Sequence, residues 1–176
     1  MNETLARTSK AVSEAEDVLQ LVGFTLSDEL FGVDILMVKE IIKNAQITAI
    51  PDAPEFIKGV INLRGNIIPI IDLRRRLKIS GNHDSHGGGQ KDTWIVILEI
   101  NSRITGFIVD HVTRVIKVPL QLIQPPPEMI SSGLKSDYVS GVCKLNEQLL
   151  AILDFNRILL VDEFKKISQL KRQGKK

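Results

Sequence analysis

The chain has 176 residues, of which 43% are hydrophobic and 25% are charged, and its formal net charge at pH 7 is +2. This composition is typical of a globular protein with a hydrophobic core and excludes a collagen-like or wholly disordered chain. The small net charge and the few aromatic residues argue against nucleic acid or an anionic membrane as the partner. Cys143 is the single cysteine of the sequence, which excludes an internal disulfide.

The two ends of the chain are more polar than its middle. Residues 1–17 lack the apolar segment behind a basic end that defines a signal peptide, and we expect them to be flexible. Residues 162–176 carry apolar side chains at helical spacing, which predicts a short C-terminal helix before a basic tail. Because the sequence has no run of about 18 apolar residues, we expect a cytoplasmic protein without direct membrane insertion.

The sequence between the ends follows a β pattern. Apolar residues alternate with others over 22–26 and again over 31–35, and the polar residues 27–29 between them predict a hairpin turn. The apolar run 94–98 is followed by a polar turn and by a returning strand over 104–109. Short strands at close spacing favour small β-barrels.

An internal repeat predicts the architecture. Residues 56–77 align with residues 138–159 at 7 identical positions of 22, where average residue usage gives about one or two. Each copy has the pattern of a strand, a tight turn, a second strand and a short helical turn. The hairpins before the two copies also correspond, with Gly32 equivalent to Gly106 and Val38 equivalent to Val112. The repeat therefore predicts two similar β subdomains in tandem.

The glycine-rich segment 78–92 lies between the two copies. Three consecutive glycines have no side chains to bury and high backbone entropy, which predicts a flexible loop or linker. Each half of the chain is short for a stable domain, so we expect an apolar interface that both halves share.

Two sets of residues are candidates for catalysis or metal binding. His83, Asp84 and His86 are metal-ligand types at close spacing, but they adjoin the flexible glycines, and a metal site needs rigid ligands. Asp72 and Asp154 are equivalent in the repeat, and capping of the next helical turn explains both. We expect no catalytic residue, no metal and no cofactor, with an enzyme built on the paired aspartates or the histidine loop as one alternative.

The tight turn is where the two copies differ most clearly. The first copy has Arg64-Gly65, whereas the second has Asn146-Glu147. The repeat keeps the framework and does not keep the arginine, which makes Arg64 a candidate for function. A solvated turn arginine is the alternative interpretation.

Another alternative is a small-barrel oligonucleotide-binding protein. It would use the cluster Arg74-Arg75-Arg76 and the basic tail, and its affinity would depend steeply on salt. The lack of aromatic residues interleaved with these basic residues argues against it.

Four segments, in this order, resemble the CheW family of chemotaxis coupling proteins: FGVDILMVKEII (31–42), TAIPDAPEFIKG (48–59), GVINLRGNIIPIIDLR (59–74) and GFIVDHVTRVI (106–116). The resemblance implies one CheW-like domain over residues 18–161. It also implies an all-β fold of two tandem five-stranded, SH3-like β-barrels that share a hydrophobic core, divided near the 78–92 loop.

The resemblance also implies partners and sites. Family members are adaptors without catalysis that couple the cytoplasmic tips of methyl-accepting chemoreceptors to the CheW-like regulatory domain of the histidine kinase CheA. The positions that match the family's receptor-binding groove are Val38, Gly59, Arg64, Gly65, Gly106, Val112 and Val115.

Three further residues are candidates for partner interfaces. Ile35 and Glu40 lie in the first of these motifs, and the family pairs an arginine at position 64 with an acidic residue at position 40. Met129 lies in the sequence PPPEMI (125–130), which resembles the loop that meets the kinase.

Overall fold

The structure, a computed structural model, describes residues 17–79, 92–127 and 136–159. Within these ranges the chain forms ten strands. In chain order they are β1 (Val18–Leu26), β2 (Glu29–Asp34), β3 (Val38–Lys43), β4 (Ile57–Leu63), β5 (Asn66–Asp72), β6 (Trp94–Ile100), β7 (Arg103–Val109), β8 (His111–Pro119), β9 (Val139–Leu145) and β10 (Gln148–Leu153). Most of the predicted flexible N-terminus and of the 78–92 linker lies outside the described residues, as do the predicted C-terminal helix and Met129.

The helical segments are all short: η1 (Ile35–Met37), α2 (Leu73–Leu77), η2 (Leu120–Leu122), η3 (Ser136–Tyr138) and α3 (Phe155–Ile158). The carboxylate of Asp72 accepts a hydrogen bond from the amide of Arg75 at 3.3 Å, at the start of α2. Asp154 accepts one from the amide of Asn156 at 3.1 Å, at the start of α3. Each aspartate satisfies a backbone donor that the helix leaves open, which confirms the capping interpretation.

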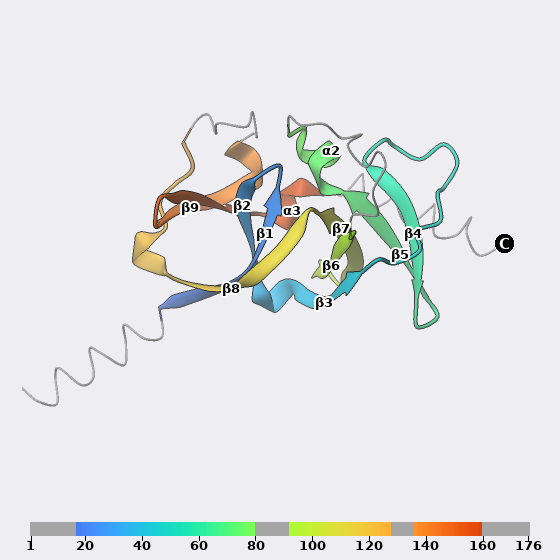
Figure 1. The fold of residues 1–176 in the computed structure, drawn as a ribbon, viewed down its shortest axis with the longest axis horizontal. Helices are drawn as coiled ribbons and strands as arrows, with labels where there is room; N and C mark the ends of the chain where they lie inside the picture. The colour runs from blue at the N-terminus through green and yellow to red at the C-terminus, as the bar shows by residue number, and fades with distance from the viewer. Residues whose placement is uncertain (1–16, 80–91, 128–135, 160–176) are drawn as a thin grey trace, which may run out of the picture.

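The strands form two five-stranded sheets (Figure 1). Sheet A has the order β8-β1-β2-β10-β9, and sheet B has the order β3-β6-β7-β5-β4. The all-β class with two subdomains is therefore confirmed. The division near residues 78–92 is not, because each sheet takes strands from both sides of that segment. The two repeat units exchange hairpins, and a repeat cannot reveal this because equivalent units offer chemically equivalent pairing partners.

The two sheets are equivalent under the repeat. Each strand of sheet A has a counterpart in sheet B whose number differs by five, for example β1 and β6 or β8 and β3. Replacing every strand of sheet A by its counterpart gives the strand order of sheet B. The register agrees as well, since Ile152 pairs with Gly32 in sheet A and Ile70 pairs with Gly106 in sheet B. Equivalent positions in the two sheets can therefore serve as internal controls for one another.

Continuous strand pairing does not close either sheet into a barrel. Instead, one isolated antiparallel bridge joins the two edges of each sheet. Thr48, after β3, pairs with Val60 of β4, and Gln124, after β8, pairs with Val142 of β9. Each bridge consists of two backbone hydrogen bonds of 2.8 to 2.9 Å.

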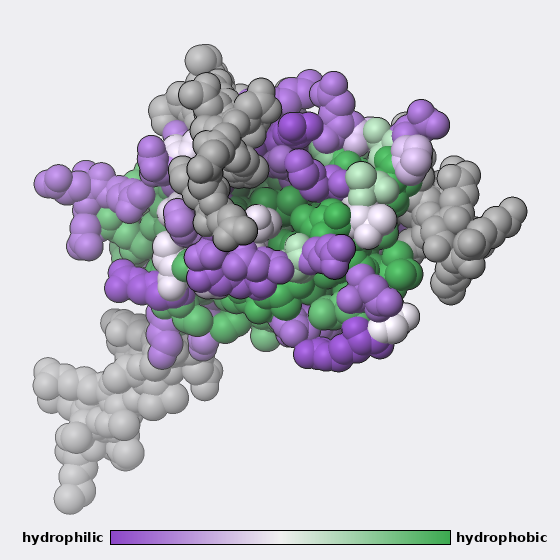
Figure 2. Space-filling view, turned by 45° about the vertical axis from the view of Figure 1, so that its right-hand side comes forward, coloured by the Kyte–Doolittle hydropathy of each residue, from purple (hydrophilic) through white to green (hydrophobic). Residues whose placement is uncertain are grey.

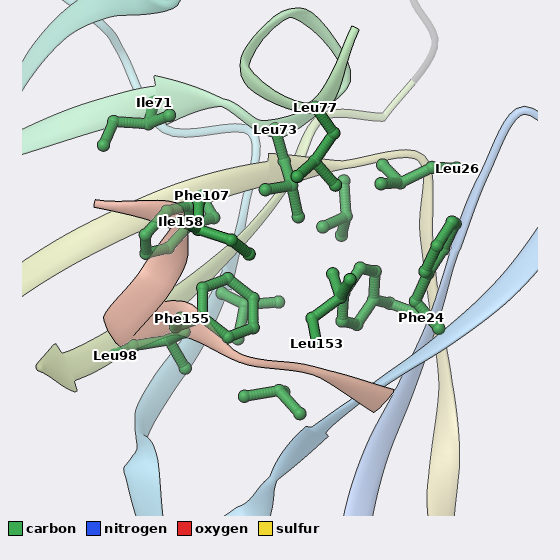
Figure 3. Close-up of a cluster of buried hydrophobic side chains, with 14 of the residues drawn as sticks. Phe24, Leu26, Ile71, Leu73, Leu77, Leu98, Phe107, Leu153, Phe155 and Ile158 are labelled. Carbon is green, nitrogen blue, oxygen red and sulfur yellow. The ribbon is translucent and has the colours of Figure 1, made fainter. Parts of the chain in front are cut away.

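A hydrophobic core shared by both sheets joins the two subdomains (Figure 3). It includes the buried side chains of Phe24 and Leu153 from sheet A, Leu98 and Phe107 from sheet B, and Phe155 from α3. The rings of Phe107 and Phe155 meet edge to face with their centroids 4.8 Å apart. This shared core confirms the expected apolar interface between the subdomains.

Each sheet also encloses a smaller apolar cluster of its own. The cluster of sheet A includes Cys143, Leu150 and Ile152, and the cluster of sheet B includes Ile61 and Ile70. Cys143 is buried there as a small hydrophobic side chain, as the sequence predicts. One face of a strand therefore contacts the shared core and the other face contacts the cluster of its own sheet.

Candidate partner-binding surface

A β-bulge in β8 turns Val112 and Val115 to the same side of sheet A. Val112 pairs with Phe24 and Val115 pairs with Val22, so two residues of β8 lie opposite the single residue Gly23. Directly paired side chains lie on the same face of a sheet, and Phe24 and Val22 belong to the shared core. Val112 and Val115 are three residues apart, yet both lie on the side of sheet A that carries the shared core.

Gly23 leaves the space that this bulge needs. A Cβ atom at Gly23 would lie 2.5 Å from the hydroxyl oxygen of Thr113 and 2.7 Å from the terminal methyl of Ile116. The carbonyl oxygen of Arg114 would also be only 3.2 Å away. A larger residue at position 23 would push the bulged residues outward and change the direction of the two valines.

Strand β3 repeats this arrangement in sheet B. Val38 pairs with Leu98, and Ile41 pairs with Val96, with an irregularity between Val38 and Glu40. Leu98 and Val96 are residues of the shared core, so Val38 and Ile41 also lie on the side that carries it. Ile41 is the repeat equivalent of Val115, just as Val38 is the equivalent of Val112.

We call Val38, Ile41, Val112 and Val115 the aliphatic frame. These four residues are partly packed against the core and partly exposed. Val38 and Val112 are half-buried and pack against the shared core. Val115 and Ile41 remain 49% and 36% exposed. Figure 2 shows hydrophobic surface between hydrophilic side chains on one face of the molecule. Sequence analysis missed Ile41, although the alignment that makes Val38 equivalent to Val112 also makes Ile41 equivalent to Val115.

The connection η1 adds a further apolar side chain next to β3. Ile35, a predicted interface residue, is half-buried and packs against the shared core. Leu36 is 87% exposed, and its amide donates a hydrogen bond of 3.0 Å to the carboxylate of Asp34. Sequence analysis did not single out Leu36, because its exposure depends on this capped turn rather than on strand periodicity.

The predicted pair of Arg64 and Glu40 forms in the structure. The two guanidinium nitrogens of Arg64 donate hydrogen bonds of 3.1 and 3.0 Å to the two carboxylate oxygens of Glu40. Glu40 lies in β3 and Arg64 in the turn after β4, so the ion pair joins the two edge strands of sheet B. The Arg64 side chain is 76% exposed, hence the pair contributes little to stability and leaves charge accessible to a partner.

Three of the predicted site residues are glycines with different environments. Gly59 and Gly106 are buried, and an added Cβ atom would lie 2.1 Å from the carbonyl oxygen of Thr48 or 2.6 Å from Ile70, respectively. Gly65 lies in the exposed turn with a φ of +86°, and nothing lies within 4 Å of its Cβ position. Gly59 and Gly106 therefore shape the strands, whereas Gly65 shapes the turn that carries Arg64.

The carboxylate of Asp92, which lies beside the end of β3, has a shifted pKa. Hydrogen bonds from Lys43 and Asn44 hold the pKa of Asp92 below its usual value. The Lys43 ammonium is 2.7 Å from one carboxylate oxygen, and the Asn44 amide nitrogen is 3.0 Å from the other. These contacts connect the end of β3 to the residues before β6 rather than forming a site for proton transfer.

The part of the chain that the structure describes contains neither a metal-ligand cluster nor a helix that could span a membrane. No group of three histidine, cysteine, aspartate or glutamate residues there could hold a metal ion. His83, Asp84 and His86 lie outside the described residues. Among the described helices, none has the length and apolar character needed to cross a membrane.

Two coupled β-sheets with exposed apolar side chains on both are typical of a protein-binding module. Comparison with known proteins gives the particular family. The family model of the CheW-like domain matches residues 20–163 of this chain. The chemotaxis protein CheW of Treponema pallidum is 36% identical over 93% of this chain and 94% of its own length. The protein of the same name from Klebsiella aerogenes is 38% identical, with coverage of 90% and 92%.

A solved structure agrees with these relatives. The crystal structure of the scaffolding protein TtCheW from Thermoanaerobacter tengcongensis superposes with a TM-score of 0.72 at 37% identity, over 82% of this chain and 94% of that one. The chain therefore belongs to the CheW family, and it is an adaptor of chemotaxis signalling. The comparisons do not support the alternative of an oligonucleotide-binding protein.

Proposed function

We propose that this chain couples the cytoplasmic tips of chemoreceptors to the histidine kinase CheA, by protein–protein binding without catalysis and in the cytoplasm. The family membership supports a chemotaxis adaptor. The observation that carries the choice of surface is the aliphatic frame, which sits on both sheets and keeps Ile41 and Val115 exposed beside the shared core.

The receptor tip binds at the aliphatic frame. An amphipathic helical hairpin presents apolar side chains along one face, and the frame offers it exposed apolar side chains from both sheets. The ion pair of Arg64 and Glu40 lies at the edge of sheet B next to the frame, because Glu40 stands between Val38 and Ile41 in β3. Glu40 itself pairs with Ile97 of the sheet B cluster, so it faces away from the two frame residues of β3. Charges at the border of an interface favour the correct orientation more than they add affinity.

The other predicted site residues have supporting roles in this proposal. Gly59 and Gly106 give the strands their close contacts, and Gly65, whose φ is positive like that of Arg64, completes the turn that carries Arg64. The kinase contacts the loop 125–130 that includes Met129, a proposal that rests on the resemblance of this loop to other family members. Receptor and kinase thus bind different parts of the chain, as an adaptor requires.

The proposal is tested by assembling the purified chain with a receptor cytoplasmic fragment and a CheA-type kinase. Sedimentation then measures how much of each partner is recovered. We expect all three proteins to sediment together, and we expect Arg64→Glu to lower receptor recovery while kinase recovery stays unchanged. Arg64→Glu reverses a charge beside the receptor-binding surface, which should lower receptor recovery. Because the turn is exposed, the cost to stability should stay below about 0.5 kcal/mol, so the chain remains folded and still binds the kinase.

Arg157→Glu provides the matched control. Arg157 of α3 is 66% exposed and forms a surface ion pair of 3.4 Å with Asp154, the residue before α3. Reversal of its charge should leave the recovery of both partners unchanged. Equal receptor recovery for Arg64→Glu and the natural chain would contradict the role of Arg64, and failure of the natural chain to bind either partner would contradict the adaptor proposal.

A further inference from the structure

The junction between β7 and β8 consists of one residue, Asp110, at which the chain passes from sheet B to sheet A. The amide of Asp110 donates a hydrogen bond of 3.0 Å to the carbonyl of Thr25, next to the pairing of Thr25 with His111. One carboxylate oxygen of Asp110 accepts a hydrogen bond of 2.8 Å from the amide of Ser27. Both contacts attach Asp110 to β1 and its turn, hence to sheet A.

The other carboxylate oxygen of Asp110 points to the opposite sheet. It lies 2.9 Å from a guanidinium nitrogen of Arg74, a residue of α2. Helix α2 follows β5 and packs beside β7, two strands of sheet B. The side chains of Arg74 and Asp110 are only 14% and 24% exposed, and an ion pair shielded from water is stronger than one on the surface. The carboxylate of Asp110 thus adds a polar link between the two sheets to the hydrophobic core that they share.

The repeat shows that the fold does not require this ion pair. The residue equivalent to Arg74 is Asn156, and the residue equivalent to Asp110 is Leu36, between which no ion pair can form. The equivalent junction, between β2 and β3, contains η1, and the carboxylate of Asp34 caps η1 there instead of reaching the other sheet. Only one of the two matching junctions therefore carries the tie between Asp110 and Arg74.

We propose that Asp110, held by Arg74, is a positioning residue for the receptor-binding surface. Val112 follows Asp110 by two residues, so the direction in which β8 leaves the junction decides where Val112 and Val115 lie relative to β3. The ion pair fixes the β8 half of the aliphatic frame against the β3 half. A frame that is already arranged binds more tightly, because the partner does not have to order it. This inference rests on the proposed function.

The distance between the two sheets tests the proposal directly. Spin labels on cysteines introduced at Lys58 of β4 and Lys117 of β8, both exposed, report the distance between sheet B and sheet A by pulsed electron paramagnetic resonance. Cys143 is buried and stays unlabelled, which the chain without introduced cysteines verifies. Asp110→Asn keeps an oxygen acceptor for the Ser27 amide and removes the charge that holds Arg74.

We expect Asp110→Asn to widen the distance distribution at least twofold and to weaken binding of the receptor fragment about fivefold to tenfold. Arg74→Gln should do the same, whereas Arg74→Lys should restore most of both properties because it keeps the charge. Glu99→Gln is the matched control, since it removes the more exposed pair of Glu99 with Lys39 within sheet B. Circular dichroism shows which variants are folded. If Asp110→Asn does not fold, Arg74→Gln serves as the test variant in its place.

A natural distance distribution in Asp110→Asn and Arg74→Gln would overturn the proposal. A widened distribution with unchanged receptor binding would also overturn it, because the sheets would then be tied without any effect on the frame. Failure of the natural chain to bind the receptor fragment would instead reject the proposed function. The distance measurement separates the two failures, since it needs no partner.

Discussion

Gly59 and Gly65 lie in the same β-hairpin, yet different physical constraints require a glycine at the two positions. At Gly59, with a φ of +151°, the backbone of Thr48 passes so close that a Cβ atom would lie 2.1 Å from its carbonyl oxygen. This close approach allows the bridge between Thr48 and Val60, which joins the edges of sheet B. At Gly65 the constraint is the φ of +86° alone, since the space around it is open.

We therefore expect Gly59→Ala to lower the free energy of unfolding by about 3 kcal/mol, because it adds a clash with backbone to an unfavourable φ. Gly65→Ala is the control with φ strain but no clash, and it should cost about 1 kcal/mol. Denaturant unfolding of both variants measures the two values. Equal costs would show that the contact with Thr48 relaxes and that the clash argument is wrong.

The aliphatic frame is a property of the strands rather than of single residues. In a regular strand, side chains three residues apart lie on opposite faces, so Val38 and Ile41 could not share a face. The bulges of β3 and β8 bring each such pair to one side. Strand periodicity in the sequence therefore predicts the wrong face for Ile41, which is why it was missed. The repeat with Val115 was the signal that could have identified it.

Ile41→Ser tests the frame. We expect it to weaken binding of a receptor fragment about fivefold, as loss of one exposed apolar contact at an interface does, with a stability cost below about 1 kcal/mol. Leu149→Ser is the matched control, because Leu149 is 45% exposed but lies in β10, away from β3 and β8. Isothermal titration calorimetry measures both affinities, and an equal loss for both variants would show that position in the frame has no special role.

At the scale of the whole molecule, the exchange of hairpins between repeat units makes the two sheets depend on one another. Each sheet contains a hairpin from the other half of the chain, and both sheets contribute to the shared core. Neither half can form a complete sheet alone. We therefore expect the described part of the molecule to unfold as one cooperative unit rather than as two subdomains.

Phe107→Ala tests this cooperativity. Phe107 is fully buried in the shared core against Phe155, so the truncation should lower the free energy of unfolding by about 3 to 5 kcal/mol. Fluorescence of Trp94, in sheet B, and far-ultraviolet circular dichroism, which reports both sheets, should still give one coincident transition. Ile61→Val, in the cluster of sheet B, is the milder control at about 1 kcal/mol. Separate transitions for the two probes would contradict the interdependence of the sheets.

The sequence by itself determined the β pattern, the repeat, the helix caps at Asp72 and Asp154 and the candidate role of Arg64. These features follow from local spacing and from comparison of one segment with another, and the motifs gave the family. Only the tertiary structure decided which hairpin joins which sheet and that a bulge turns Ile41 to the same face as Val38. It alone also showed that Asp110 meets Arg74. Strand exchange, bulges and ion pairs between sheets depend on contacts between residues distant in the chain, and no local period encodes them.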